Sequence, residues 1–156
     1  MNYMKPKNIN IQGFSLIEVL VSLIILSIGL LGLMSVLLLS IQGNNNSNLR
    51  TQATIAAYDM SERIRANIPG FKAGKYNAIT TTTAGADCTT CSTSDLAKKD
   101  IFEWHKYLAD NLPEGKGSVL PATNADDGLD ITVFWKESDK SGSSKEKQFI
   151  LRVRNI

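Results

Sequence analysis

The sequence has few of the residue types on which most catalytic and metal sites depend. It contains one histidine, His105, and two cysteines, Cys88 and Cys91, in 156 residues. A structural zinc site needs about four ligands, so this set favours no metal site. The chain also carries no GxSxG or paired-carboxylate signature to organise a nucleophile. We therefore expect a protein that is not an enzyme and that needs no metal or cofactor.

Charge is unevenly distributed. Lys5 and Lys7 account for the whole net charge of +2, because the remaining 15 Lys and Arg residues balance the 15 Asp and Glu residues. The balance implies no basic surface for nucleic acid. From Val19 to Ile41 there is no charged residue, and about 18 such residues already indicate a membrane span. This distribution favours a membrane-tethered domain over a cytosolic enzyme.

The apolar run from Phe14 to Ile41 predicts a retained transmembrane helix. At about 1.5 Å per residue it forms a helix of roughly 42 Å, enough to cross a hydrocarbon core of about 30 Å. A cleaved secretory signal usually has an apolar region of about 7–15 residues and a small-x-small cleavage site. Here the run is longer and leads into Gln42-Gly43. Lys5 and Lys7 precede it, which places the N-terminus in the cytoplasm and exports the rest.

Glu18 is the only charged residue in this apolar segment. A charge at the helix centre costs roughly 2.5–3.5 kcal/mol on insertion scales, so an intramembrane acid is a functional candidate. A position in the first turn, where the helix dipole favours an acid, is the simpler explanation. At about 100° per residue, however, small residues share the face of Glu18, and such residues let helices approach closely in lipid. This candidate helix-packing face comprises Ser15, Ser22, Gly29 and Ser40, with Gly32 at its edge.

Helical periodicity continues in the exported part. Residues 43–48 are weak helix formers that could bend or fray the helix. Beyond them, apolar residues from Leu49 to Ile64 recur at helical spacing on one face. Pro69-Gly70 ends the element. We expect one helix from Phe14 to Asn67, apolar all round in its first half and amphipathic in its second.

Residues 71–94 are expected to be mostly loop, and they contain Cys88 and Cys91. After export these cysteines meet an oxidising compartment, so we expect a disulfide. A thioredoxin-like redox centre would need them at a helix start within a βαβ framework, which the pattern does not show. We interpret the pair as a structural staple. A membrane-tethered thiol-disulfide enzyme is the alternative from another functional class.

The remainder of the chain predicts one more helix and a small sheet. The helix runs from about Asp95 to Leu112, and His105 is expected to be a packing or surface residue. The polar linker 138–147 joins the last two strands as a hairpin. An antiparallel sheet of about three strands would bury one face against the long helix, with Trp104 and Trp135 in the core. The strand signals lie at Ser118–Leu120, Leu129–Lys136 and Gln148–Arg154.

The N-terminal motif carries a resemblance to a known family. Gly13-Phe14-Ser15-Leu16-Ile17-Glu18 follows a short basic leader and opens the apolar helix, and this combination resembles the class III signal of type IV prepilins. The resemblance implies that a prepilin peptidase cuts between Gly13 and Phe14 and methylates Phe14. It also implies that Glu18 pairs with the N-terminal amine of a neighbouring subunit. In a low dielectric such a pair relieves two desolvated charges together.

The fold implied by this resemblance is the pilin α+β fold, a long N-terminal helix with a small antiparallel sheet on its exported half and a second helix. The expected organisation is a prepilin leader at residues 1–13, a transmembrane helix half at 14–42 and a periplasmic globular domain at 43–156. No proline interrupts the apolar segment, whereas many major pilins have one there. That difference argues against a bulk fibre subunit.

Within the family, the chain is most similar to the PilV-type minor pilins. The matching stretches are Gly13–Leu33, Asp59–Asn67, and Trp104 followed by Leu112–Gly115. The resemblance implies a protein that initiates type IV pilus assembly with other minor pilins, the major pilin and the inner-membrane assembly platform. It would cross the inner membrane once, be incorporated into the pilus near its tip, and support twitching, adhesion or DNA uptake. A minor pseudopilin of type II secretion, which shares leader and fold, is the alternative.

Overall fold

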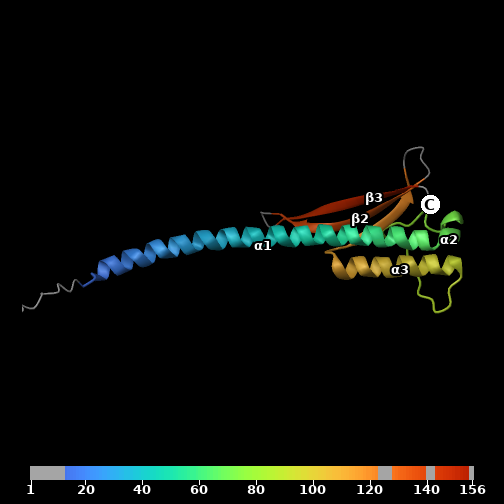
Figure 1. Cartoon of the computed structure of the whole chain (residues 1–156). Helices are drawn as coiled ribbons and strands as arrows, with labels where there is room; N and C mark the ends of the chain where they lie inside the picture. Colours follow the sequence, from blue (N-terminus) through green and yellow to red (C-terminus); the bar gives the residue numbers. More distant parts are fainter. Residues whose placement is uncertain (1–12, 123–127, 140–142, 155–156) are drawn as a thin grey trace, which may run out of the picture. The chain divides into compact units, whose positions relative to one another are not determined.

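A computed structural model describes residues 13–122, 128–139 and 143–154 (Figure 1). Contacts within the chain divide it after Ser40 into an N-terminal unit and a larger unit that begins at Ile41. The secondary structure is α+β, with a long apolar N-terminal helix, as the sequence predicts. The elements are α1 (Leu16–Ala66), α2 (Ile68–Lys72), α3 (Thr93–Asn111), β1 (Lys116–Pro121), β2 (Gly128–Ser138) and β3 (Ser144–Arg154).

Helix α1 has 51 residues, and its two halves differ in burial. Up to Ile41, every described side chain is exposed, and the large apolar ones expose 48–86% of their surface. Beyond that point one face is buried, beginning at Leu49. The helix matches the expected one to within two residues at its start and one at its end. The buried residues are Leu49, Ala53, Ala56, Ala57, Met60, Ser61 and Ile64.

Helix α1 is continuous through residues 43–48, so the expected single helix is confirmed across this segment of weak helix formers. In a helix interior Gly costs about 1 kcal/mol relative to Ala, and Asn up to about 0.7. Tertiary contacts offset these costs. Gln42 and Asn46 donate hydrogen bonds to backbone carbonyls at the end of β2, and Arg50 donates two to the carboxylate of Glu137. We call these contacts between Gln42, Asn46, Arg50 and residues 137–139 the polar clamp.

The sheet has three antiparallel strands in the order β1-β2-β3. Alternate residues of β2 are buried, which is the pattern of a sheet with one face on the core. The expected hairpin of β2 and β3 is confirmed, in a register from Gly128 opposite Arg154 to Ser138 opposite Ser144. Both strands are longer than predicted, so the connection is shorter than the expected linker. Its residues 140–142 lie outside the described residues.

Within the larger unit, the second half of α1 lies between the sheet and α3 (Figure 1). Small alanines on the buried face of α1 let the neighbouring elements approach closely. Trp104 of α3 is fully buried and its indole Nε1 donates a 2.9 Å hydrogen bond to the carbonyl of Ala56. Trp135 of β2 is also buried. Both tryptophans are therefore core residues, as expected.

Sequence analysis missed the short helix α2, which runs across Pro69-Gly70. Proline is tolerated in the first turn of a helix because its missing N–H would have no intrahelical partner there. Asn67 caps α2, and its side-chain oxygen accepts a hydrogen bond from the amide of Gly70. The end of α1 before Pro69 was nevertheless predicted correctly.

Gly117 provides a test of the packing. A Cβ at this position would overlap the ring of Trp104, so Gly117→Ala should lower the free energy of unfolding by about 1–3 kcal/mol. Gly43→Ala is the control, because a Cβ there meets nothing within 4 Å and should stabilise the helix by up to about 1 kcal/mol. Urea unfolding of the full chain in detergent measures both. Equal effects of the two substitutions would contradict this packing.

The ion pair between Arg50 and Glu137 predicts a pH dependence. Hydrogen bonds from Arg50 hold the pKa of Glu137 below its usual value, and burial opposes this. The native carboxylate thus releases its proton more readily than the unfolded one. The resulting stabilisation is complete above the ordinary pKa of glutamate and is lost as the pH falls through the native pKa. The stability difference between the wild type and Glu137→Gln should therefore shrink from about pH 7 to about pH 3.

Urea titrations at the two pH values measure this difference. The exposed Glu62, which pairs with Arg65, supplies the control variant Glu62→Gln. That variant should differ little from the wild type at either pH. A Glu137→Gln effect of the same size at both pH values would contradict the assignment.

Candidate functional site

The first site is the junction at the start of α1. Gly13, Phe14 and Ser15 precede the helix and are exposed. The carbonyl of Ser15 accepts hydrogen bonds from the amides of Glu18 and Val19, at 3.1 and 3.3 Å, and so begins the helix. The peptide bond between Gly13 and Phe14 therefore lies in exposed, non-helical chain. Such segments are the ones that proteases reach most readily.

Glu18 lies in the first turn of α1 with its side chain exposed. Glu18 and Ser22 are one helical turn apart on α1, and Phe14 lies beside them although it precedes the helix. Together with neighbouring apolar side chains they line a hollow of about 320 Å³. Among the described residues, no ion pair involves Glu18, since all of them join residues from Arg50 onward. The N-terminus of the helix favours the negative charge.

The small residues near Glu18 are not needed by packing within the chain. A Cβ added at Gly29 or Gly32 would meet nothing within 4 Å. The hydroxyl of Ser22 donates to the carbonyl of Glu18 at 2.8 Å. Ser27 and Ser35 likewise donate to carbonyls four residues earlier. These serines thus satisfy their hydroxyls inside one helix, which is what a lipid environment demands of polar groups.

Cys88 and Cys91 form the expected disulfide. Both cysteines are partly buried and directly precede α3, whose N-cap is Ser92. The side chain of Lys99 donates a 3.3 Å hydrogen bond to the carbonyl of Cys88, so the disulfide loop is tied to α3. The pair therefore lies at a helix start, but the described sheet is antiparallel rather than part of a βαβ unit. This environment fits a staple.

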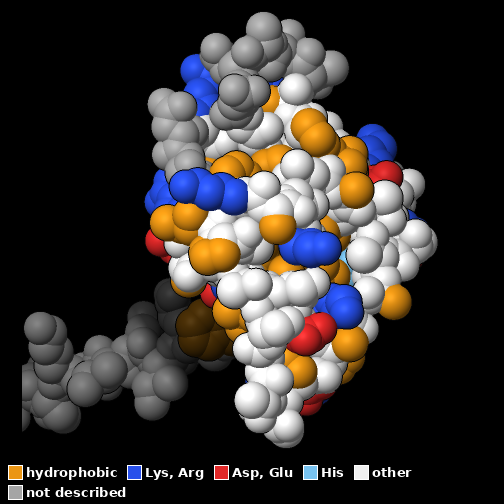
Figure 2. All heavy atoms as spheres, turned by 90° about the vertical axis from the view of Figure 1, so that its right-hand side faces the viewer, with side chains coloured by type: hydrophobic (Ala, Val, Ile, Leu, Met, Phe, Trp, Pro, Cys, Tyr) orange, Lys and Arg blue, Asp and Glu red, His pale blue; other side chains and the backbone are white. Residues whose placement is uncertain are grey.

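The remaining polar candidates serve packing. His105 is partly buried, and its Nε2 lies 3.2 Å from the carbonyl of Gly117. Within residues 13–122, 128–139 and 143–154, no group of three His, Cys, Asp or Glu side chains could hold a metal ion. On the end face shown in Figure 2, Lys and Arg side chains are spread among hydrophobic and uncharged groups.

A buried polar cluster was missed by sequence analysis. The Tyr76 hydroxyl donates a 2.6 Å hydrogen bond to Asp100 and accepts one from the Asn67 side chain. Burial raises the pKa of both Tyr76 and Asp100. Arg63 reaches Asp100 at 3.4 Å and Glu103 at 2.7 Å. The cluster joins the end of α1 to α3, and no local motif announces it because its members are far apart in sequence.

Comparison with known proteins decides the nature of the N-terminal site. Residues 9–34 match the family model described as the prokaryotic N-terminal methylation motif. The N-terminus is a type IV pilin-like leader. The matched segment includes the junction at Gly13 and Phe14, Glu18, and the start of α1. No curated protein and no solved structure matches the chain.

The match explains several features of this pilin-like protein. Leaders of this type are processed by prepilin peptidase, and proteins that carry them are structural subunits that assemble with other pilins. One helix among the described residues, α1, is long and apolar enough to cross a membrane, and an 18-residue window within it has a mean hydropathy of 2.6. The leader and this helix together support a membrane-anchored, pilin-like protein.

Processing at the junction can be tested by mass spectrometry of the mature N-terminus. We predict that the mature chain begins at a Phe14 that carries one methyl group. In a host that lacks prepilin peptidase, the same chain should keep residues 1–13. An active, assembled protein that begins at Met1 would contradict the prediction.

The disulfide can be tested with the double substitution of Cys88 and Cys91 by alanine. Loss of so short a loop should lower the free energy of unfolding by about 2 kcal/mol, as measured in urea. Thiol trapping on whole cells should find the wild-type pair oxidised throughout growth. A pair that cycles between thiol and disulfide would instead support a redox role.

Proposed function

We propose that this protein is a minor pilin of the PilV type that initiates type IV pilus assembly with other minor pilins. The proposal rests on the first half of α1, whose apolar side chains are exposed. This half has one acidic residue, in its first turn, and it follows a pilin-like leader. A structural subunit needs such a helix because its contacts are made with other subunits. The exported unit contributes shape rather than chemistry.

The proposed recognition step uses Glu18. Cleavage before Phe14 creates a new amine at the edge of the apolar segment. An amine and a carboxylate that meet in a low dielectric stabilise each other's charged forms. The hollow beside Phe14 and Glu18 is open on the helix surface, so the N-terminus of a second subunit can approach the carboxylate there.

The proposed assembly step uses the helix surface beyond Glu18. Gly29 and Gly32 leave open space on α1, and small residues let two helices approach closely within lipid. Ser15 and Ser22 continue this surface toward the N-terminus. Apolar helices that bundle laterally in this way would pre-assemble minor pilins before a cytoplasmic motor draws the fibre outward.

The proposal includes a topology and a set of partners. The N-terminus faces the cytoplasm, where prepilin peptidase acts, and the unit beyond Ser40 is periplasmic. The partners are other minor pilins, the major pilin and the inner-membrane assembly platform, with the bilayer as solvent for α1. After assembly the protein lies near the tip of the pilus. No cofactor and no direct contact with nucleic acid is part of this function.

Replacement of Glu18 by Gln tests the proposal. The substitution keeps the shape of the side chain and removes its charge, so it should reduce surface pili and capture of partner pilins about tenfold or more. Electron microscopy and co-purification from membranes measure the two effects. Glu62→Gln is the matched control, because Glu62 lies on the exposed exported face of α1 and should leave both unchanged. Normal piliation and partner capture by Glu18→Gln would refute the proposed role.

A further inference from the structure

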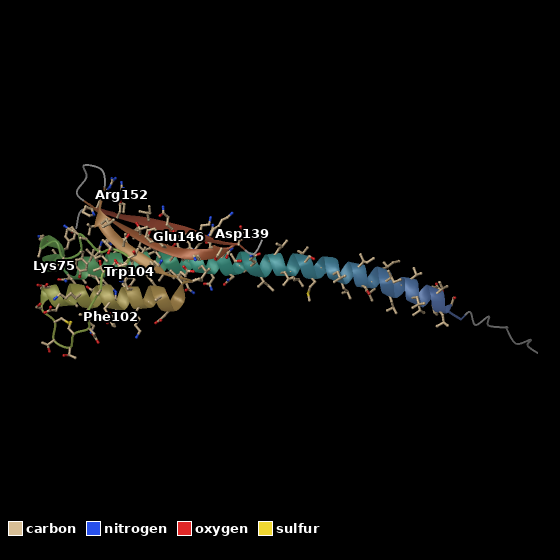
Figure 3. All side chains as sticks on the ribbon, turned by 180° about the vertical axis from the view of Figure 1, so that it is seen from behind. Lys75, Phe102, Trp104, Asp139, Glu146 and Arg152 are labelled. Carbon is tan, nitrogen blue, oxygen red and sulfur yellow. A yellow bond between two sulfur atoms is a disulfide. The ribbon has the colours of Figure 1, made fainter. Side chains whose placement is uncertain are left out.

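The polar clamp joins one side of α1 to the end of β2. Gln42, Asn46 and Arg50 follow one another at intervals of four residues and so lie on one side of the helix. The Gln42 Nε2 donates to the carbonyl of Asp139 at 2.7 Å, and the Asn46 Nδ2 donates to the carbonyl of Ser138 at 2.9 Å. Figure 3 shows Asp139 at the end of the sheet beside α1.

The third contact of the clamp is charged. The Arg50 guanidinium makes two 2.8 Å hydrogen bonds to the Glu137 carboxylate. Trp135 also donates its indole N–H to this carboxylate, at 3.1 Å. The Glu137 side chain is only 5% exposed, whereas that of Arg50 is 62% exposed. Arg50 is therefore the half of this ion pair that another molecule can reach.

The helical turns between these contacts have few other stabilising interactions. Residues 43–48 read Gly-Asn-Asn-Asn-Ser-Asn, all weak helix formers. The buried face of α1 begins only at Leu49, so no apolar burial secures this segment. In addition, the Ser47 hydroxyl donates to the carbonyl of Gly43, and this kind of contact slightly destabilises helices.

We propose that the polar clamp is a releasable fastening that keeps residues 42–48 helical. When the clamp opens, this segment unwinds while the core from Leu49 onward stays folded. An extended chain spans about 3.3 Å per residue against 1.5 Å in a helix, so the seven residues 42–48 lengthen the chain by about 13 Å when they unwind. The connection between Ile41 and Leu49 is thus extensible without unfolding of the exported unit. This device does not depend on Glu18 or on the proposed partners.

Two alanine substitutions in the same asparagine run distinguish the clamp from intrinsic propensity. Asn46→Ala removes a clamp contact, whereas Asn45 is exposed and its replacement changes propensity alone. Alanine is the better helix former in both variants. Hydrogen exchange of the full chain in detergent micelles is the measurement. Backbone amides of residues 43–50 should exchange about twofold faster in Asn46→Ala, because the lost hydrogen bond outweighs the gain in helix propensity. They should exchange about threefold more slowly in Asn45→Ala.

Exchange in β2 from Ile131 to Trp135 reports whether the core is intact. The proposal requires this strand to exchange at the wild-type rate in both variants, and Gln42→Ala to behave like Asn46→Ala. Slower or unchanged exchange at residues 43–50 in Asn46→Ala would overturn it, because propensity would then outweigh the clamp. Faster exchange throughout the core would also overturn it, because the segment would not unwind independently.

Discussion

Residues Leu16–Ala66 form one helix, and up to Ile41 its apolar side chains are exposed on every side. In water, so large an apolar surface is strongly unfavourable, and in lipid it is the normal state of a membrane helix. The requirement that lipid or other helices cover it explains the rest of the molecule. Burial begins on the second half of α1, and up to Ile41 no described side chain of the helix is buried.

The second half of α1 is buried on one face, in contrast to the first half. Small side chains such as Ala53 and Ala56 line its buried face, so the sheet and α3 approach closely from two sides. The indole of Trp104 fills the space between them and satisfies its N–H on the Ala56 carbonyl. Before Leu49, where no side chain of α1 is buried, polar side chains of the helix contact the end of β2 instead. Along α1, polar contacts with β2 are thus followed by a buried apolar face.

Local patterns predicted the elements of the fold well. Three local signals predicted elements that the structure contains. They are the apolar run, the i+3/i+4 spacing after Leu49 and the alternation in the last strand. The side-chain contacts between distant segments could not be predicted from the sequence. The polar clamp depends on residues near position 46 meeting residues near 138, and the cluster around Asp100 joins three distant segments. Neither set of contacts produces a periodic pattern in the sequence.

The asparagine-rich segment is helical as expected, although its composition gives the helix little support. Contacts of Gln42, Asn46 and Arg50 with residues 137–139, which are distant in sequence, accompany the helix there. The N-terminal site behaves in the opposite way, because its chemistry is local. Gly13, Phe14 and Glu18 are adjacent in sequence and carry their signal without the fold. The structure adds that the junction is exposed and that Phe14 and Glu18 share one hollow.

The central claim is that another subunit's helix covers the face of α1 that carries Glu18. The most direct measurement places a photoreactive amino acid at Ser22, on that face, and in a second strain at Leu20, about 160° away around the helix. After irradiation of living cells, the account predicts cross-links from position 22 to other pilins and few protein cross-links from position 20. Equal cross-linking from both positions, or none from position 22, would contradict it.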